Sequence, residues 1–166
     1  MGVSGGLCYS RFVIADSYIL PECIVRPGSF GGLMVLYEAN FIKFNQLVEE
    51  MRSFSGEAVS TARTDCDLYL GVTEKTKYTS SIRLTYLFAG VNNQPLADPD
   101  LMAKIYFDAG IVEVRGWRNG SRHQILRSLS QRYASPRTVD LCWARNIMLS
   151  KWLDYLLDKG HRFSLT

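Results

Sequence analysis

The chain has 166 residues, of which 47% are hydrophobic and 21% are charged, with 19 Lys and Arg against 16 Asp and Glu. This composition excludes a disordered, collagen-like or low-complexity protein, and the length predicts one domain with one core. No apolar run approaches the ~18 residues that a membrane span needs, and no basic region precedes the N-terminal apolar stretch, as it would in a secretory signal. We therefore expect a cytoplasmic protein without membrane association.

The residues that most often bind metals are few and scattered. The chain has two histidines, His123 and His161, and no Cys-x-x-Cys pair among its four cysteines, which are Cys8, Cys23, Cys66 and Cys142. A zinc site needs several ligands at short spacing, and a secreted disulfide scaffold is shorter and richer in cysteine. We expect reduced thiols, no metal site and no cofactor.

Glycines and prolines punctuate the first 30 residues, so we expect residues 1–23 to be a partly ordered N-terminal extension and residues 24–166 to form a single domain. Ser29 is a suitable N-cap for a helix predicted over residues 31–52. Its apolar positions recur at steps of three or four: Phe30, Leu33, Tyr37, Phe41, Phe44, Val48 and Met51. The opposite, polar face carries Lys43, Gln46, Glu49, Glu50 and Arg52.

After a turn-like stretch over residues 53–64, the hydrophobic period changes to two, which is typical of strands. Residues 68–73 and 82–88 predict a hairpin around the polar turn 74–77, and residues 90–99 have the composition of a loop. Residues 101–107 and 111–117 predict a second hairpin, whose turn contains Gly110 at a position where a positive φ is favourable. Residues 122–133 fit either a fifth strand or a short helix.

Helical periodicity returns over residues 139–157, and Gly160 is a helix-stop signal. The order helix, strands, helix with short connections predicts an α+β fold. In this fold an antiparallel sheet of four or five strands is flanked by an N-terminal and a C-terminal helix, both covering one face.

Five groups of residues occur in a fixed order along residues 27–161. They are Met34-x-x-Tyr37-Glu38-x-Asn40-Phe41; Val72-Thr-Glu74-x-Thr76-x-Tyr78-Thr79; Ile105-Tyr106-x-Asp108-Ala109 with Glu113-Val114; Arg132-Tyr133 with Pro136; and Asp140 with Asn146, Leu149, Trp152-Leu153 and Gly160-His161. Together they resemble the YqiB-like family of bacterial proteins. The resemblance implies a small cytoplasmic bacterial domain without an established activity, and it assigns no catalytic residue.

Two groups of charged residues are candidate sites. Glu74, Asp108 and Glu113 are the weak catalytic candidates, because carboxylates that face each other across a cleft can perform acid/base hydrolysis. No acid occurs between Val114 and Val139, whereas six arginines with interleaved aromatic residues do, as in sites that hold phosphates and stack on bases. These anion-binding candidates are Arg115, Arg118, Arg122, Arg127, Arg132 and Arg137.

The leading hypothesis is a non-enzymatic binding or adaptor domain with a macromolecular partner. The first alternative is binding of RNA or another polyanion along residues 115–137. The second alternative is a hydrolase that uses the three carboxylates.

Overall fold

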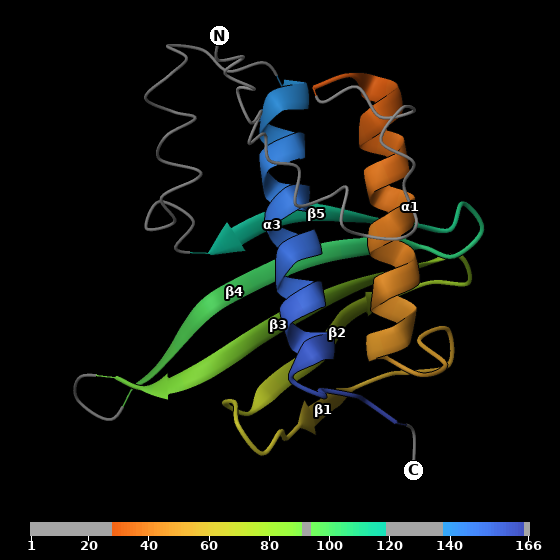
Figure 1. The fold of residues 1–166 in the computed structure, drawn as a ribbon. Coiled ribbons are helices and arrows are strands. Elements are labelled where there is room, and N and C mark those ends of the chain that lie inside the picture. The colour runs from red at the N-terminus through yellow and green to blue at the C-terminus, as the bar shows by residue number, and fades with distance from the viewer. Residues whose placement is uncertain (1–27, 91–93, 119–137, 165–166) are drawn as a thin grey trace, which may run out of the picture.

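The computed structural model describes residues 28–90, 94–118 and 138–164, and it has the predicted α+β architecture (Figure 1). In chain order the elements are α1 (Phe30–Leu47), β1 (Glu57–Ser60), β2 (Leu68–Lys75), β3 (Thr79–Ala89), β4 (Pro95–Tyr106), β5 (Ile111–Arg118) and α3 (Thr138–Asp158). The strands form one antiparallel sheet in the order β1-β2-β3-β4-β5. Both helices lie on the same face of the sheet (Figure 1), which confirms the predicted arrangement.

Helix α1 begins as predicted but ends five residues early. The Ser29 hydroxyl accepts a hydrogen bond from the Gly32 amide at 3.1 Å, as an N-cap does. The helix ends at Leu47, Val48 is extended, and Glu50 has a φ of 50°. The predicted end at residue 52 was wrong because Val48 and Met51 are buried in the same core as α1, so the apolar pattern continues after the backbone has left the helix.

The two predicted hairpins are confirmed as the pairs β2–β3 and β4–β5, and Gly110 has the expected positive φ of 63°. The stretch 53–64 was expected to be turn-like, but it contains β1, which pairs with β2 from Glu57↔Gly71 to Ser60↔Leu68. Part of the expected loop 90–99 is also strand, because β4 already begins at Pro95. The segment 122–133, ambiguous in sequence, lies outside the described residues.

The main core lies between the sheet and the helices. Its fully buried side chains include Phe44 from α1, Ile82 and Leu101 from the sheet, and Leu149 and Leu153 from α3. The helix α3 and the positive φ of Gly160, 85°, agree with the prediction.

Lys43 was expected on the exposed face of α1, but it is buried between α1 and α3. Its ammonium group lies 2.7 Å from a carboxylate oxygen of Asp154 and 2.9 Å from the Ser150 hydroxyl. The sequence-based placement failed because these partners lie on α3, far away in the sequence, and a buried cation is tolerated when it is paired.

Strands β3 and β4 reach beyond their neighbours. Strand β2 begins at Leu68, opposite Tyr86, and β5 ends at Arg118, opposite Asp100. Residues 87–89 of β3 and 95–97 of β4, which we call the distal hairpin, therefore pair only with each other among the described strands. Figure 1 shows this two-stranded ribbon projecting away from the helices.

Candidate functional site

The structure separates two of the three candidate catalytic carboxylates, Glu74 and Glu113. Glu74, Ser81, Lys104 and Glu113 follow one another across β2, β3, β4 and β5 as successive pairing partners. At about 4.8 Å per strand, Glu74 and Glu113 are about 14 Å apart, beyond the ~5–10 Å between the carboxyl groups of glycoside hydrolases, an example of paired-carboxylate catalysis. Asp108 lies exposed in the β4–β5 turn.

Two of these carboxylates have local partners on the sheet. The Ser81 hydroxyl donates to Glu74 at 3.2 Å. Glu113 accepts from the Tyr106 hydroxyl at 3.3 Å and from the Arg115 guanidinium at 3.1 Å. The pKa of Tyr106 is raised, first by burial and then by the charge of Glu113. The contacts of Glu74 with Ser81 and of Glu113 with Tyr106 join neighbouring strands and are typical of cross-strand pairs that stabilise a sheet, whereas Arg115 lies on β5 with Glu113.

One of the candidate anion-binding arginines can be described with its contacts. Arg115 is exposed and paired with Glu113. Arg118 is the last residue of β5, and the other four lie outside the described residues: Arg122, Arg127, Arg132 and Arg137. Polyanion binding along residues 115–137 stays a prediction.

Two further cations on the sheet lie beside carboxylates. Arg83 donates two hydrogen bonds to Asp100, at 2.6 and 2.9 Å, and this contact raises the pKa of Arg83. Lys104 is the pairing partner of Glu113. Arg83, Lys104 and Arg115 therefore each lie beside an acid, unlike the cations of a surface built for phosphates.

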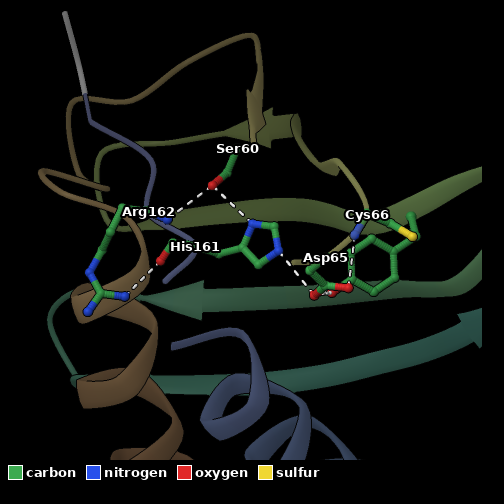
Figure 2. Close-up of polar contacts among 6 residues, drawn as sticks. Ser60, Asp65, Cys66, His161 and Arg162 are labelled. Atoms are coloured by element: carbon green, nitrogen blue, oxygen red, sulfur yellow. Dashed lines mark hydrogen bonds and ion pairs between the residues drawn. The ribbon is translucent and has the colours of Figure 1, made fainter. Parts of the chain in front are cut away.

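A buried polar cluster that sequence reasoning missed surrounds His161 (Figure 2). His161 is 0% exposed and Ser60 is 4% exposed. The Nδ1 atom of His161 lies 3.2 Å from the Ser60 hydroxyl, and its Nε2 atom lies 3.2 Å from the Asp65 carboxylate. The same carboxylate accepts from the Tyr86 hydroxyl at 2.7 Å. We call Ser60, Asp65, Tyr86 and His161 the His161 cluster.

Hydrogen bonds hold Asp65 in its charged form. Burial opposes ionisation, but donors from the Tyr86 hydroxyl, the Cys66 amide and His161 outweigh it, so the pKa of Asp65 lies below its ordinary value. Burial, together with Asp65, raises the pKa of Tyr86. The cluster is therefore one carboxylate surrounded by donors.

Serine, histidine and aspartate are also the residue types of acyl-transfer triads, in which the serine attacks a substrate carbonyl. Here Ser60 is nearly inaccessible, and its hydroxyl oxygen already accepts the Arg162 amide at 3.0 Å. Phe163, the residue after Arg162, exchanges main-chain hydrogen bonds with Leu47 and Glu49 at 2.8 and 2.9 Å. The geometry is that of a structural fastening between β1 and the segment after α3.

The distal hairpin exposes apolar side chains. Leu87, Phe88 and Leu96 are 38%, 40% and 39% exposed, and Phe88 and Leu96 are pairing partners. The ring of Phe88 contacts that of Tyr86, with 6.2 Å between centroids, and Tyr86 in turn contacts Trp152 at 5.7 Å. The base of the hairpin is thus anchored to α3, while its far part is uncovered by either helix.

The described residues offer no other obvious chemical centre. Among them, no three His, Cys, Asp or Glu side chains gather as a metal would require. Neither described helix combines the length and the apolar character needed to cross a membrane.

A family model with the description "Protein of unknown function (DUF1249)" matches residues 43–162, more than two thirds of the chain. The chain belongs to this family. The match confirms the expected membership in a family of unknown function, whereas the YqiB-like name stays a prediction. No curated protein and no solved structure matches the chain. The DUF1249 match includes all five strands, the distal hairpin and the His161 cluster.

Proposed function

We propose that this DUF1249 protein is a non-enzymatic binding domain whose partner is another protein, bound at the distal hairpin. The observation that carries the proposal is the exposure of Leu87, Phe88 and Leu96 together on a projecting ribbon. Apolar surface in water costs about 25 cal/mol per Å² relative to its buried state, and clustered apolar surface is typical of interaction sites.

The chemistry of the other candidate groups supports binding over catalysis. Glu74 and Glu113 are too far apart to act on one bond, and the Ser60 hydroxyl is enclosed in the His161 cluster. Glu74, Glu113 and Ser60 have hydrogen-bond partners within the fold, whereas Leu87, Phe88 and Leu96 of the distal hairpin are 38–40% exposed.

A protein partner fits the hairpin better than a polyanion. Residues 87–90 and 94–97 contain no charged side chain, whereas nucleic-acid surfaces depend on Lys and Arg for affinity.

The proposal also places residues 24–166 as one domain in the bacterial cytoplasm. The free thiols of Cys66 and Cys142 support that location, because reducing compartments keep thiols unpaired.

The test is capture of a partner from lysate of the source organism, with and without nuclease treatment, by the wild-type chain, Phe88→Asp and Tyr78→Asp. Tyr78 is a matched control, because it is an exposed aromatic residue in the β2–β3 turn, immediately before the opposite end of β3. We expect a protein that the wild type and Tyr78→Asp retain and that Phe88→Asp captures at least tenfold less, as quantified by mass spectrometry. Equal capture by all three chains would refute the proposal, as would binding that nuclease removes.

A further inference from the structure

We infer that the partner contributes an extended segment, which adds as a strand to the edge of β3 at Leu87–Ala89. This inference rests on the proposed function and specifies how the hairpin binds. The pairing of β2 with β3 ends at Leu68↔Tyr86. Among the described residues, no strand lies beside Leu87, Phe88 or Ala89 on the side that β2 has left.

An edge of this kind can accept a strand. In an antiparallel ladder, alternate residues direct both their N–H and C=O groups to the same side. Past Tyr86, those groups on the β2 side of β3 have no strand to bond among the residues that the structure describes, and unpaired edges are templates for another chain. Natural sheet edges are commonly blocked by charged side chains or by proline. This edge has neither, because its residues are Leu87, Phe88 and Ala89.

The opposite edge of the ribbon is less suitable, which makes the inference specific to β3. Strand β4 contains Pro95 and Pro99, and proline has no N–H to donate to a ladder. Ala97, between them, already has an interaction partner.

The exposed side chains define the segment that would fit. Side chains of an added strand alternate between the two faces of the sheet, so one set would lie beside Phe88 and the other beside Leu87. Because the hairpin carries no charge here, the matching positions of the partner are apolar. In strand addition the main chain supplies affinity and such alternate contacts supply specificity.

The occupant is a short segment of a different protein and not a second copy of this chain. A stable protein interface buries about 1,200–2,000 Å² and involves about 20–30 residues on each side. The free edge offers three residues, Leu87 to Ala89, a length that suits a linear peptide.

The experiment uses a displayed library of random 12-residue peptides, selected on the immobilised full chain and counter-selected on Phe88→Asp. The best peptide is then synthesised with an N-methyl group at one position at a time, and its Kd is measured by fluorescence anisotropy. We expect at least tenfold weaker binding for methylation at alternate positions and little change at those between, because every second amide faces β3. Tyr78→Asp should bind like the wild type.

Other outcomes would overturn the inference in distinguishable ways. A peptide that depends on Phe88 without the alternating pattern would exclude strand addition and leave the binding function standing. A library that yields no Phe88-dependent peptide would exclude a linear segment, while lysate capture decides the proposed function separately. A dimer in sedimentation that Phe88→Asp abolishes would make the occupant a second copy. If circular dichroism shows that Phe88→Asp does not fold, Leu96→Asp replaces it throughout, because Leu96 on β4 is the pairing partner of Phe88.

Discussion

Replacing His161 with alanine should lower the free energy of unfolding by about 3–4 kcal/mol. The ring makes two hydrogen bonds at 3.2 Å, a buried one to the Ser60 hydroxyl and a partly buried one to the charged Asp65. A neutral bond contributes about 1 kcal/mol and a bond to a charged group about 1.5–3 kcal/mol, and the cavity left by the ring adds to their sum. The loss stays in this range because Asp65 keeps the Tyr86 and Cys66 donors.

Urea unfolding at neutral pH, followed by circular dichroism, measures this loss as a lower midpoint at unchanged slope. Two amide variants separate the two bonds. His161→Gln can reach Asp65 in place of Nε2, and His161→Asn can reach Ser60 in place of Nδ1. We expect the glutamine variant to be the more stable of the two, because it keeps the charged bond.

Arg162→Ala is the control beside the cluster, since its main-chain bond to Ser60 survives the substitution. It should change stability by less than about 1 kcal/mol, as is usual for exposed side chains. A difference typical of surface sites, within about 0.5 kcal/mol, between the free energies of unfolding of His161→Ala and the wild type would refute the assigned role of the cluster. An asparagine variant more stable than the glutamine variant would show that Ser60 is the more important partner.

Four other predictions concern acid stability, packing, charge and the domain boundary. The lowered pKa of Asp65 stabilises the fold fully above the ordinary value of 3.8, and this contribution is lost as the pH falls through the folded-state pKa. In Asp65→Asn the free energy of unfolding, measured by urea titration, should therefore fall less steeply towards acid pH than in the wild type. An unchanged pH dependence would contradict this. Trp152→Ala should cost about 3 kcal/mol, because Trp152 is partly buried between Tyr86 and Trp117; an unchanged unfolding midpoint would show that this packing contributes nothing. If residues 115–137 bind polyanions, the triple variant Arg118→Ala, Arg122→Ala and Arg127→Ala should bind single-stranded RNA or heparin at least tenfold more weakly than the wild type at ~50 mM salt. A wild-type chain that binds neither polyanion would refute that hypothesis. A chain that starts at Ile24 should lose less than about 1 kcal/mol, and an insoluble product would show that residues 1–23 belong to the core.

Local patterns predicted the helices and hairpins because each has a period that neighbouring residues reveal. The end of α1 was misplaced for the same reason, since Val48 and Met51 keep the period although the backbone has turned. Burial follows tertiary position, so periodicity alone cannot show where helical hydrogen bonding stops.

Strand β1 and the first part of β4 were missed because their sequences lack such a period. Glu57–Ser60 is a four-residue edge strand whose conformation depends on pairing with β2. The prolines at positions 95 and 99 are typical of a loop, but they are tolerated in β4 where the neighbouring strand β5 has ended.

The His161 cluster gave no sequence signal that could be recognised. Ser60, Asp65, Tyr86 and His161 are spread over a hundred residues and meet only when β1, β3 and the segment after α3 are in place. The same holds for the distal hairpin, because the alternation of β3 cannot show that β2 stops at Tyr86.

The direct packing of α1 on α3 makes the order of synthesis matter for this fold. Asn40 donates to the Asn146 carbonyl at 3.1 Å across 106 positions of sequence, and α3 supplies Leu149 and Leu153 to the core under the sheet. On the ribosome, the sheet is therefore made while part of its apolar face has no cover. At about 5–20 residues per second, the 40 residues from Arg118 to Asp158 take roughly 2–8 s to translate. During those seconds the sheet lacks the apolar side chains of α3, and exposed apolar surface in an incompletely folded chain favours aggregation.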